Sequence, residues 1–258
     1  MILASGQLIL RCRETFQSNQ YRVNPVVKAI FFDVFGTVID WRKGLAHGFE
    51  RAFAKSGREI SSHALADAWY QAYRARVRDP LAQDVRGDEV ASASLQDVLE
   101  TGKLDRVLGD KDTAQLASSW QRLPSWPDSV PGLRALRREY VIAPCTDIPT
   151  STMTWLAKHA GLPWDLVLGT DLVGEGRRGG LLAGAVQAIG LTPGEVMYAS
   201  AHNADLAVAR SAGLKTAFFA RPKEFGAEQT HDLAPEDSWE VVAFDLLDLA
   251  RHMESAIY

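Results

Sequence analysis

The segment 26–35 contains a short apolar run at 29–32 that ends abruptly on an acid. It is rich in bulky side chains, carries Asp33 near its end and is followed by the turn-forming pair Gly36 and Thr37. Such a pattern predicts a buried strand that delivers a carboxylate to the edge of a sheet. Ligands of open α/β sheets bind beyond the carboxyl ends of parallel strands, so we expect Asp33 to act either as a nucleophile or as a ligand.

Residues 45–121 have a helical pattern instead. Ala, Leu, Arg, Glu and Gln dominate this segment, and apolar residues recur at spacings of three and four between Leu65 and Tyr73. The pair Ser61 and Ser62 predicts the start of that helix. We therefore predict an insertion of four or five helices.

After Trp126, strand-like apolar runs alternate with helical patterns. We predict strands at 140–145, 166–169, 196–200 and 216–220, and helices at 151–159, 181–189 and 204–211. Such alternation is typical of a parallel, doubly wound sheet. The run at 216–220 is the last clear strand.

These patterns together predict an α/β protein with a Rossmann-like, doubly wound parallel sheet core and an inserted α-helical cap domain. We place the core at 26–43 and 124–258 and the cap at 44–123. Residues 1–25 show neither clear periodicity nor helix caps, and we interpret them as an N-terminal extension, either a disordered tail or an upstream start-site artefact. A cleft between core and cap follows, with the strand ends as its floor.

The composition narrows the class of protein. A chain of 258 residues is long enough for one large domain or for one domain with a subdomain. The net charge of -4 and a pI near 5.9 give no reason to expect a nucleic-acid or membrane partner. Two cysteines do not form a disulfide framework, and no apolar stretch is long enough to span a bilayer. We expect a soluble cytoplasmic protein.

Several polar side chains follow the predicted strands. Those at the three strand ends, and in the loop before the third of these strands, are Asp33, Thr146, Asp147, Arg177, Arg178, Ser200, His202 and Asp205. They are expected to converge, because the carboxyl ends of parallel strands share one edge of the sheet. One carboxylate could then attack a substrate while a second activates water to cleave the resulting ester. A single strand-end Asp is equally compatible with a helix N-cap, but three converging ends favour a site.

The segment FDVFGTVIDW at 32–41 resembles the first motif of the haloacid dehalogenase superfamily, in particular its type II L-2-haloacid dehalogenase branch. Other segments similar to this branch are WPDSVPGL at 126–133, AKHAGLPWD at 157–165 and DLAPEDSW at 232–239. The resemblance implies a hydrolase in which Asp33 displaces halide from C2 of a 2-haloacid and inverts that carbon. Water activated near Asp205 then hydrolyses the ester.

The same resemblance assigns roles to the neighbouring polar residues. Thr37 would hold the nucleophile by a hydrogen bond, and Ser200 and His202 would line the site. The hydroxyl of Thr146 would bind the carboxylate of a small 2-substituted acid. Relatives are often homodimers, so a homodimer is a further expectation.

Phe35, which we also expect to bind the substrate, separates this chain from the phosphatases of the superfamily. Those enzymes carry a second Asp two residues after the nucleophile, which protonates the leaving alkoxide, whereas Phe35 cannot donate a proton. Their fourth motif also has two acids that bind Mg²⁺, at positions occupied here by Ala201 and Asp205. The resemblance therefore implies a metal-independent enzyme without a cofactor.

Three positions depart from the branch. Asp147 stands where the branch has an Asn that helps to accept the halide, and an ionised Asp147 would repel it. Tyr70 replaces an Arg that acts on the leaving halide, and Arg74 lies one helical turn further on. The branch also has a Lys that holds the nucleophile in place. In this chain Arg177 is the first candidate for that cation and Arg178 is the second.

The aromatic residues of this part of the chain, Trp41, Trp69, Tyr70 and Tyr73, could wall an apolar pocket or simply pack in the core. His202 is open to a similar choice between a structural and a site role. For the whole protein, three alternatives to a dehalogenase remain. One is a diverged hydrolase acting on a non-halogenated substrate, for which Asp147 would favour a cationic leaving group. The second is a catalytically inactive ligand-binding protein of the same fold, and the third and weakest is a Mg²⁺-dependent phosphatase.

Overall fold

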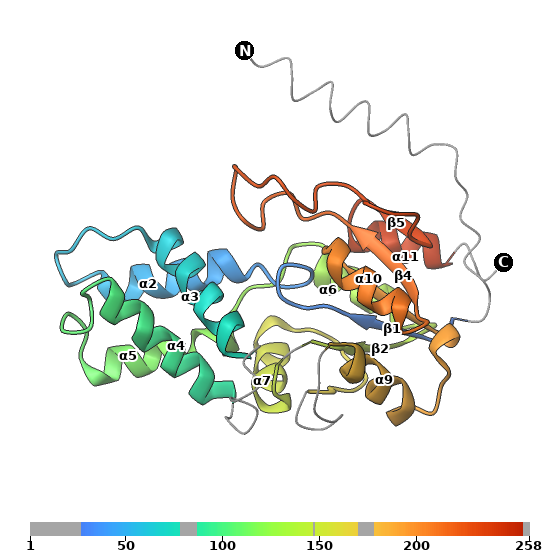
Figure 1. Ribbon diagram of the computed structural model, residues 1–258, viewed down its shortest axis with the longest axis horizontal. Coiled ribbons are helices and arrows are strands. Elements are labelled where there is room, and N and C mark those ends of the chain that lie inside the picture. The colour runs from blue at the N-terminus through green and yellow to red at the C-terminus, as the bar shows by residue number, and fades with distance from the viewer. Residues whose placement is uncertain (1–26, 78–86, 147, 170–177, 255–258) are drawn as a thin grey trace, which may run out of the picture.

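The computed structural model describes residues 27–77, 87–146, 148–169 and 178–254. Figure 1 shows two lobes, one built around a sheet and the other made of helices. The five strands are parallel, in the order β2-β1-β3-β4-β5. They are β1 (Ala29–Phe32), β2 (Val141–Pro144), β3 (Val196–Ser200), β4 (Lys215–Phe219) and β5 (Val241–Ala243). The predicted α/β class with a parallel sheet is confirmed.

Helices cover both faces of the sheet. Successive side chains of β1 point to opposite faces, and Ile30 and Phe32 belong to one buried cluster while Ala29 and Phe31 belong to another. Every residue of β1 is buried, as expected for a parallel strand between two layers of helices. The helices of this lobe are α6 (Ser129–Leu136), α7 (Thr150–Ala160), α9 (Arg178–Ala188), the short η3 (Pro193–Glu195), α10 (Asn203–Ser211) and α11 (Leu246–Glu254). Together with the strands they form the sheet core.

Between β1 and β2 the chain forms a second lobe, the helical insert. It comprises α2 (Trp41–Phe53), α3 (Ser62–Val77), α4 (Gly87–Thr101), α5 (Asp110–Ala117) and the 3-10 helix η2 (Ser118–Arg122). The side chain of Asp40 accepts a hydrogen bond from the backbone N–H of Lys43 and so caps α2. Helix α3 begins at Ser62, as the serine pair predicted.

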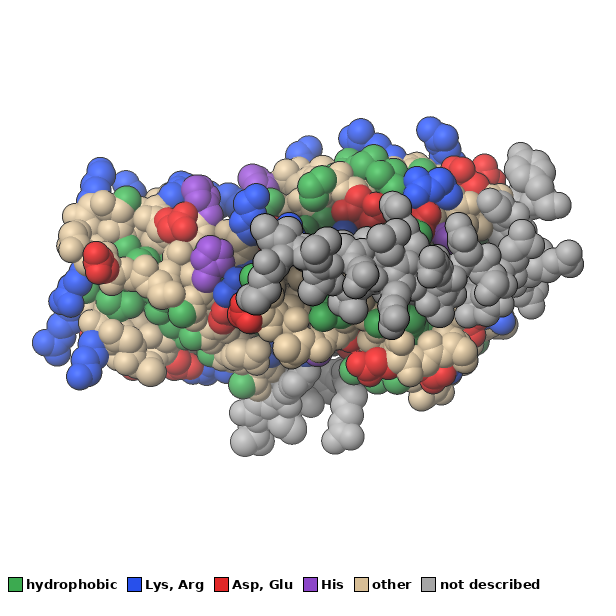
Figure 2. All heavy atoms as spheres, turned by 90° about the horizontal axis from the view of Figure 1, so that it is seen from above, with side chains coloured by type: hydrophobic (Ala, Val, Ile, Leu, Met, Phe, Trp, Pro, Cys, Tyr) green, Lys and Arg blue, Asp and Glu red, His purple; other side chains and the backbone are tan. Residues whose placement is uncertain are grey.

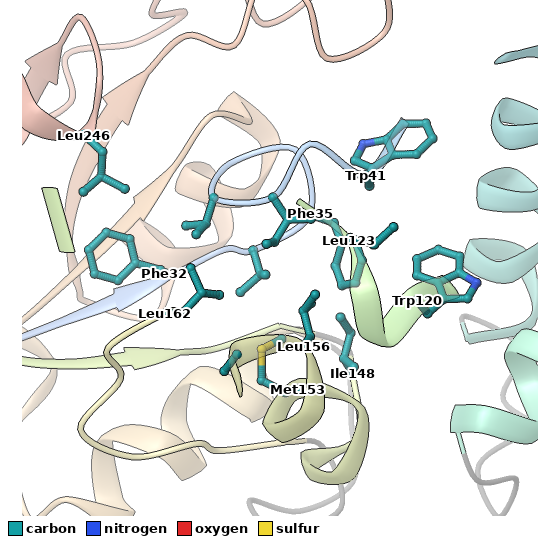
Figure 3. Close-up of a cluster of buried hydrophobic side chains, with 14 of the residues drawn as sticks. Phe32, Phe35, Trp41, Trp120, Leu123, Ile148, Met153, Leu156, Leu162 and Leu246 are labelled. Carbon is teal, nitrogen blue, oxygen red and sulfur yellow. The ribbon is translucent and has the colours of Figure 1, made fainter. Parts of the chain in front are cut away.

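The buried core continues from the sheet into the helical insert. Figure 3 shows Phe32 and Leu246 beside the sheet and Trp41 and Trp120 toward the insert, and all four belong to one cluster of buried residues. Phe35 lies between them and makes an edge contact with Trp120, with ring centroids 5.2 Å apart. Packed side chains therefore hold the sheet core and the helical insert in a defined position relative to each other.

The structure corrects the predicted strands in three places. The segment 166–169 is not a strand; Leu168 forms only an isolated bridge with Cys145, one residue beyond the end of β2. The last strand is β5, whose three residues are too few to give a recognisable pattern. The first strand is shorter than 26–35, because the backbone turns back at Val34, whose carbonyl accepts from the N–H groups of Val38 and Ile39.

The distribution of charged side chains on the surface agrees with the modest net charge of the chain. On the face drawn in Figure 2, basic and acidic side chains are spread over both lobes. Among the described residues, no helix is both long and apolar enough to cross a bilayer. Cys145 is fully buried, whereas Cys12 and the extension at 1–25 lie outside the described residues.

Candidate active site

The carboxyl ends of three neighbouring strands meet at one edge of the sheet. Asp33 follows the central strand β1, Thr146 follows β2 and His202 follows β3. These three side chains line a cavity of about 180 Å³ together with Asp205 at the start of α10 and Tyr70 of the helical insert. The predicted convergence of strand ends therefore occurs, and the cavity lies between the sheet core and the helical insert.

Asp33 is held in a buried turn. Its backbone N–H donates to the carbonyl of Ala199 at 3.0 Å, and the residue is 2% exposed. The turn continues through Gly36, which has φ of 86° and whose carbonyl accepts from the indole N–H of Trp126 at 2.8 Å. The carboxylate is thus presented to the cavity from a backbone that neighbouring residues fix on both sides.

Thr37 orients the carboxylate of Asp33. Its hydroxyl donates to Asp33 Oδ2 at 2.6 Å and accepts from the backbone N–H of Ala201 at 2.9 Å. Because the N–H of Ala201 points at the hydroxyl oxygen, the hydroxyl proton is directed toward Asp33. The guanidinium of Arg221 secures the same turn, since it donates to the carbonyl of Thr37 and forms a bidentate pair with Asp128.

His202 contacts three carboxylates at once. Its Nδ1 lies 3.2 Å from Asp33 Oδ2 and 3.5 Å from Asp205 Oδ2, and its Nε2 lies 2.9 Å from Glu224 Oε2. Burial by itself would lower the pKa of His202, but the charge of Glu224 and the hydrogen bonds to Asp33 and Glu224 raise it to about 10. The imidazole is therefore a cation at neutral pH.

Glu224 is a residue that the sequence analysis missed. Its side chain is 1% exposed, and its Oε1 accepts from the indole N–H of Trp41 at 3.0 Å. It follows β4, which pairs with β3, so it reaches the same sheet edge as His202. The rule that ligands gather at strand ends could have found Glu224, had it been applied to β4 as well as to the three earlier strands.

The opposite wall of the cavity is aromatic and belongs to the helical insert. Tyr70, Tyr73 and Trp120 line it, and the guanidinium of Arg74 lies 5.5 Å from the centroid of the Tyr70 ring. Trp41 stacks on Tyr70 with ring centroids 3.9 Å apart, but it lies behind the wall and is 1% exposed. The two predicted roles for these aromatics are thus divided, with Tyr70 and Tyr73 facing the cavity and Trp41 packing in the core.

The remaining predicted residues fall into two groups. Phe35 and Thr146 line the cavity. Ser200 is fully buried and lies behind the cavity wall, where its hydroxyl accepts from the backbone N–H of His202 at 3.0 Å.

Asp147 and Arg177 lie outside the described residues, and so does the side chain of Arg178. The substitution of an Arg for the missing Lys therefore stays a prediction. The same holds for the non-halogenated alternative, because it depended on Asp147.

Asp33, His202 and Asp205 have the spacing of a metal site, since one donor atom from each lies within 4.8 Å of the others. The chemistry of the histidine does not fit a metal. In this structure both ring nitrogens face carboxylate oxygens, Nδ1 at 3.2 Å from Asp33 and Nε2 at 2.9 Å from Glu224, whereas a ligand nitrogen must be unprotonated and turned toward the metal. The imidazolium occupies the place between the two aspartates.

The fold and the site define an α/β protein with a buried carboxylate, a charged histidine and a second acid at the floor of a small cavity. The chain belongs to the haloacid dehalogenase-like hydrolases, because the model of that family matches residues 27–213. Among the curated proteins, no sequence matches this chain significantly.

Comparison with solved structures shows which members of this family the chain is similar to. The defluorinating L-2-haloacid dehalogenase Rha0230 is 38% identical with a TM-score of 0.85, over 90% of this chain and 98% of the other. The L-2-haloacid dehalogenase PA0810 is 39% identical with a TM-score of 0.83, over 89% and 99% of the two chains. An L-2-haloacid dehalogenase from Xanthobacter autotrophicus with covalently bound chloropropionic acid, 22% identical, has a TM-score of 0.71 over 88% and 98%. This third likeness shows the fold alone.

Proposed function

We propose that this protein is a metal-independent hydrolase of small 2-substituted carboxylates, and that 2-haloacids are its substrates. The observation that carries the proposal is the Asp33 carboxylate, which is 2% exposed, bonded by Thr37 and placed at the floor of a cavity of about 180 Å³. The two relatives with 38% and 39% identity, both described as L-2-haloacid dehalogenases, support this choice of substrate.

In the first step, an oxygen of Asp33 attacks C2 of the haloacid. The new O–C2 bond forms as the carbon–halogen bond breaks, the halide leaves with the electron pair, and C2 is inverted. Thr146 lines the cavity and offers a hydroxyl to the substrate carboxylate. Arg74 lines the opposite wall and supplies a positive charge for an anion, either the carboxylate or the departing halide.

In the second step, water attacks the carboxyl carbon of the Asp33 ester. Asp205 lies on the same cavity and takes the proton of this water. The bond between that carbon and the Asp33 oxygen attached to C2 then breaks. This oxygen receives the proton held by Asp205 and leaves as the hydroxyl of the 2-hydroxy acid. One oxygen of Asp33 is replaced by an oxygen of water in each cycle.

The size of the cavity favours substrates of two or three carbons. Rings of Tyr70, Tyr73 and Trp120 close its insert side, which leaves little room for a longer chain. Chloroacetate and (S)-2-chloropropionate are therefore the first compounds to test. Fluoroacetate belongs in the same set, because one of the two closer relatives is described as defluorinating.

The test is halide release from these acids, measured with and without EDTA. We expect turnover that EDTA does not reduce, and one atom of ¹⁸O in the peptide that contains Asp33 after a single turnover in H₂¹⁸O. The variant Asp33→Asn serves as the control and should release no halide. Absence of halide release from every acid would overturn the dehalogenase assignment, and the absence of both adduct and label would favour a ligand-binding protein.

A further inference from the structure

We propose that Glu224 is a positioning residue that holds His202 as an imidazolium against Asp33 Oδ2, and that this imidazolium and the Thr37 hydroxyl together stabilise the oxyanion formed during ester hydrolysis. The inference deepens the proposed function and rests on it for the chemical step. It assigns a role to a buried carboxylate outside the motifs that the sequence analysis singled out.

The position of His202 is fixed through both of its ring nitrogens. Nε2 lies 2.9 Å from Glu224 Oε2, and this contact aims Nδ1 at Asp33 Oδ2, 3.2 Å away. The backbone N–H of His202 is also held, because it donates to the hydroxyl of Ser200 at 3.0 Å. The ring therefore has little freedom to turn away from Asp33.

Glu224 is itself built into the structure. Trp41 donates its indole N–H to Oε1 at 3.0 Å. A Cβ placed on Gly36 would lie 2.0 Å from Glu224 Oε1, so the absence of a side chain at Gly36 makes the space that the carboxylate fills. A carboxylate that is 1% exposed needs a cation nearby, and His202 is in direct contact with it.

Two donors converge on one oxygen of Asp33. Thr37 Oγ1 lies 2.6 Å and His202 Nδ1 lies 3.2 Å from Oδ2. We assign the attack on C2 to Oδ1, so that Oδ2 becomes the carbonyl oxygen of the ester. When water adds to the carboxyl carbon, the electron pair of the C=O bond moves to Oδ2, where both donors already point.

The proton and charge balance follow from this assignment. Asp205 takes one proton from the attacking water, and the oxyanion on Oδ2 is matched by the imidazolium. Collapse restores the C=O bond and breaks the bond to Oδ1, which leaves as the hydroxyl oxygen of the product with the proton from Asp205. The second proton of the water remains on the new Asp33 carboxyl and is released to the solvent, which restores the carboxylate nucleophile. His202 keeps both protons throughout, and its raised pKa agrees with that role.

The charged groups around His202 come from three parts of the chain. Asp33 follows β1, Asp205 lies in the first turn of α10 and Glu224 follows β4. Other titratable side chains that line the same cavity are Tyr70, Tyr73, Arg74, His231 and Asp232. Of the three contacting carboxylates, Glu224 alone faces the ring nitrogen that points away from Asp33.

The deciding variant is Glu224→Gln, which keeps the size of the side chain and removes its charge. We expect the pKa of His202 to fall by at least two units, as followed by NMR of the labelled histidine side chains, with His202→Gln to assign the signal. Glu228→Gln is the matched control, because Glu228 is exposed and lies four residues further along the same segment. It should leave both the pKa of His202 and turnover unchanged.

The kinetic readout separates the two chemical steps. In Glu224→Gln, halide release should show a burst of one equivalent, followed by a kcat lower by about 10²–10³-fold, as for the loss of an oxyanion donor. Intact-mass spectrometry should show the Asp33 adduct accumulating, and the alkaline limb of the kcat profile should move to lower pH. An unchanged pH profile, or equal slowing of both steps without an adduct, would overturn the oxyanion role.

A second variant guards against a folding defect in Glu224→Gln. Trp41→Phe removes the hydrogen bond to Glu224 and keeps an aromatic ring stacked on Tyr70. It loosens the anchorage of Glu224 but keeps its charge, so the pKa of His202 should change by a smaller amount than in Glu224→Gln. If the pKa of His202 does not move in either variant, the positioning role of Glu224 is wrong. If wild-type protein releases no halide while the pKa responds, the proposed function fails and the charge arrangement stands.

Discussion

The two walls of the cavity are built by different kinds of interaction. On the core wall, Asp33, Thr37 and His202 are tied together by hydrogen bonds and ion pairs of 2.6–3.2 Å, measured between named atoms. On the insert wall, Tyr70 and Trp120 are held by ring contacts, with centroids 6.3 Å apart. Directional bonds place atoms to within a few tenths of an ångström, whereas ring packing sets the shape of a surface and tolerates small shifts.

This difference matches the two halves of the proposed reaction. The nucleophile and the donors for the oxyanion need defined positions, and the core wall provides them. The insert wall has to admit a substrate and receive its leaving group, for which shape and one positive charge from Arg74 suffice. We therefore expect substitutions on the core wall to change kcat, and substitutions on the insert wall to change substrate preference.

The largest effect is expected for the nucleophile itself. Asp33→Asn should lower halide release by about 10⁴-fold or more, because the covalent step has no other carboxylate in the same position. The measurement is steady-state halide release with 2-chloropropionate. Asp205→Asn is the informative comparison, since it should still form the ester and then fail to hydrolyse it. Full activity in Asp33→Asn would contradict the assignment of the nucleophile to the core wall.

Thr37→Val should lower kcat by about 10²–10³-fold. The change removes a donor to Asp33 Oδ2 and leaves the N–H of Ala201 without its acceptor, so the free energy of unfolding should also fall by about 1–3 kcal/mol. Activity assays and thermal unfolding measure the two effects. Thr37→Ser keeps the hydroxyl and should retain most of both, whereas equal losses in the two variants would point to packing as the cause.

Alkaline pH should weaken the core wall selectively. The pKa of His202 is raised from 6.5 to about 10 on folding, so its contribution to stability is complete below pH 6.5 and is lost as pH rises through 10. The loss should be on the order of a few kcal/mol in the free energy of unfolding. Urea unfolding at several pH values would measure it, with His202→Gln as the reference. A parallel pH dependence in wild type and variant would show that other groups are responsible.

The smallest of these effects is expected on the insert wall. Arg74→Met should lower kcat/KM by roughly 10- to 100-fold through the loss of a charged hydrogen-bond donor, and Arg74→Lys should recover part of it. Comparing fluoro-, chloro- and bromoacetate shows which anion Arg74 serves. A loss that is greatest for fluoride assigns it to the leaving group, and an equal loss for all three assigns it to the substrate carboxylate.

The sequence predicted the core wall better than the insert wall. Asp33 and His202 follow strands whose apolar runs are plain, so the sheet rule brought them together correctly. Glu224 was missed because it stands in an irregular segment after β4, and its burial depends on Trp41 and Gly36, far away in sequence. Strand β5 was missed because three residues carry too little pattern. The placement of Tyr70 in front of Trp41 depends on how α2 and α3 pack, which local spacing does not determine.

The imidazolium of His202 has one more consequence. A metal ion can be removed from a protein by a chelator, whereas a cation that belongs to the polypeptide is always present at one equivalent and needs no supply from the medium. His202 loses this charge only when it releases a proton to the solvent. Strong alkali would thus act on this site as a chelator acts on a metalloenzyme, and the effect would be reversed simply by returning to neutral pH.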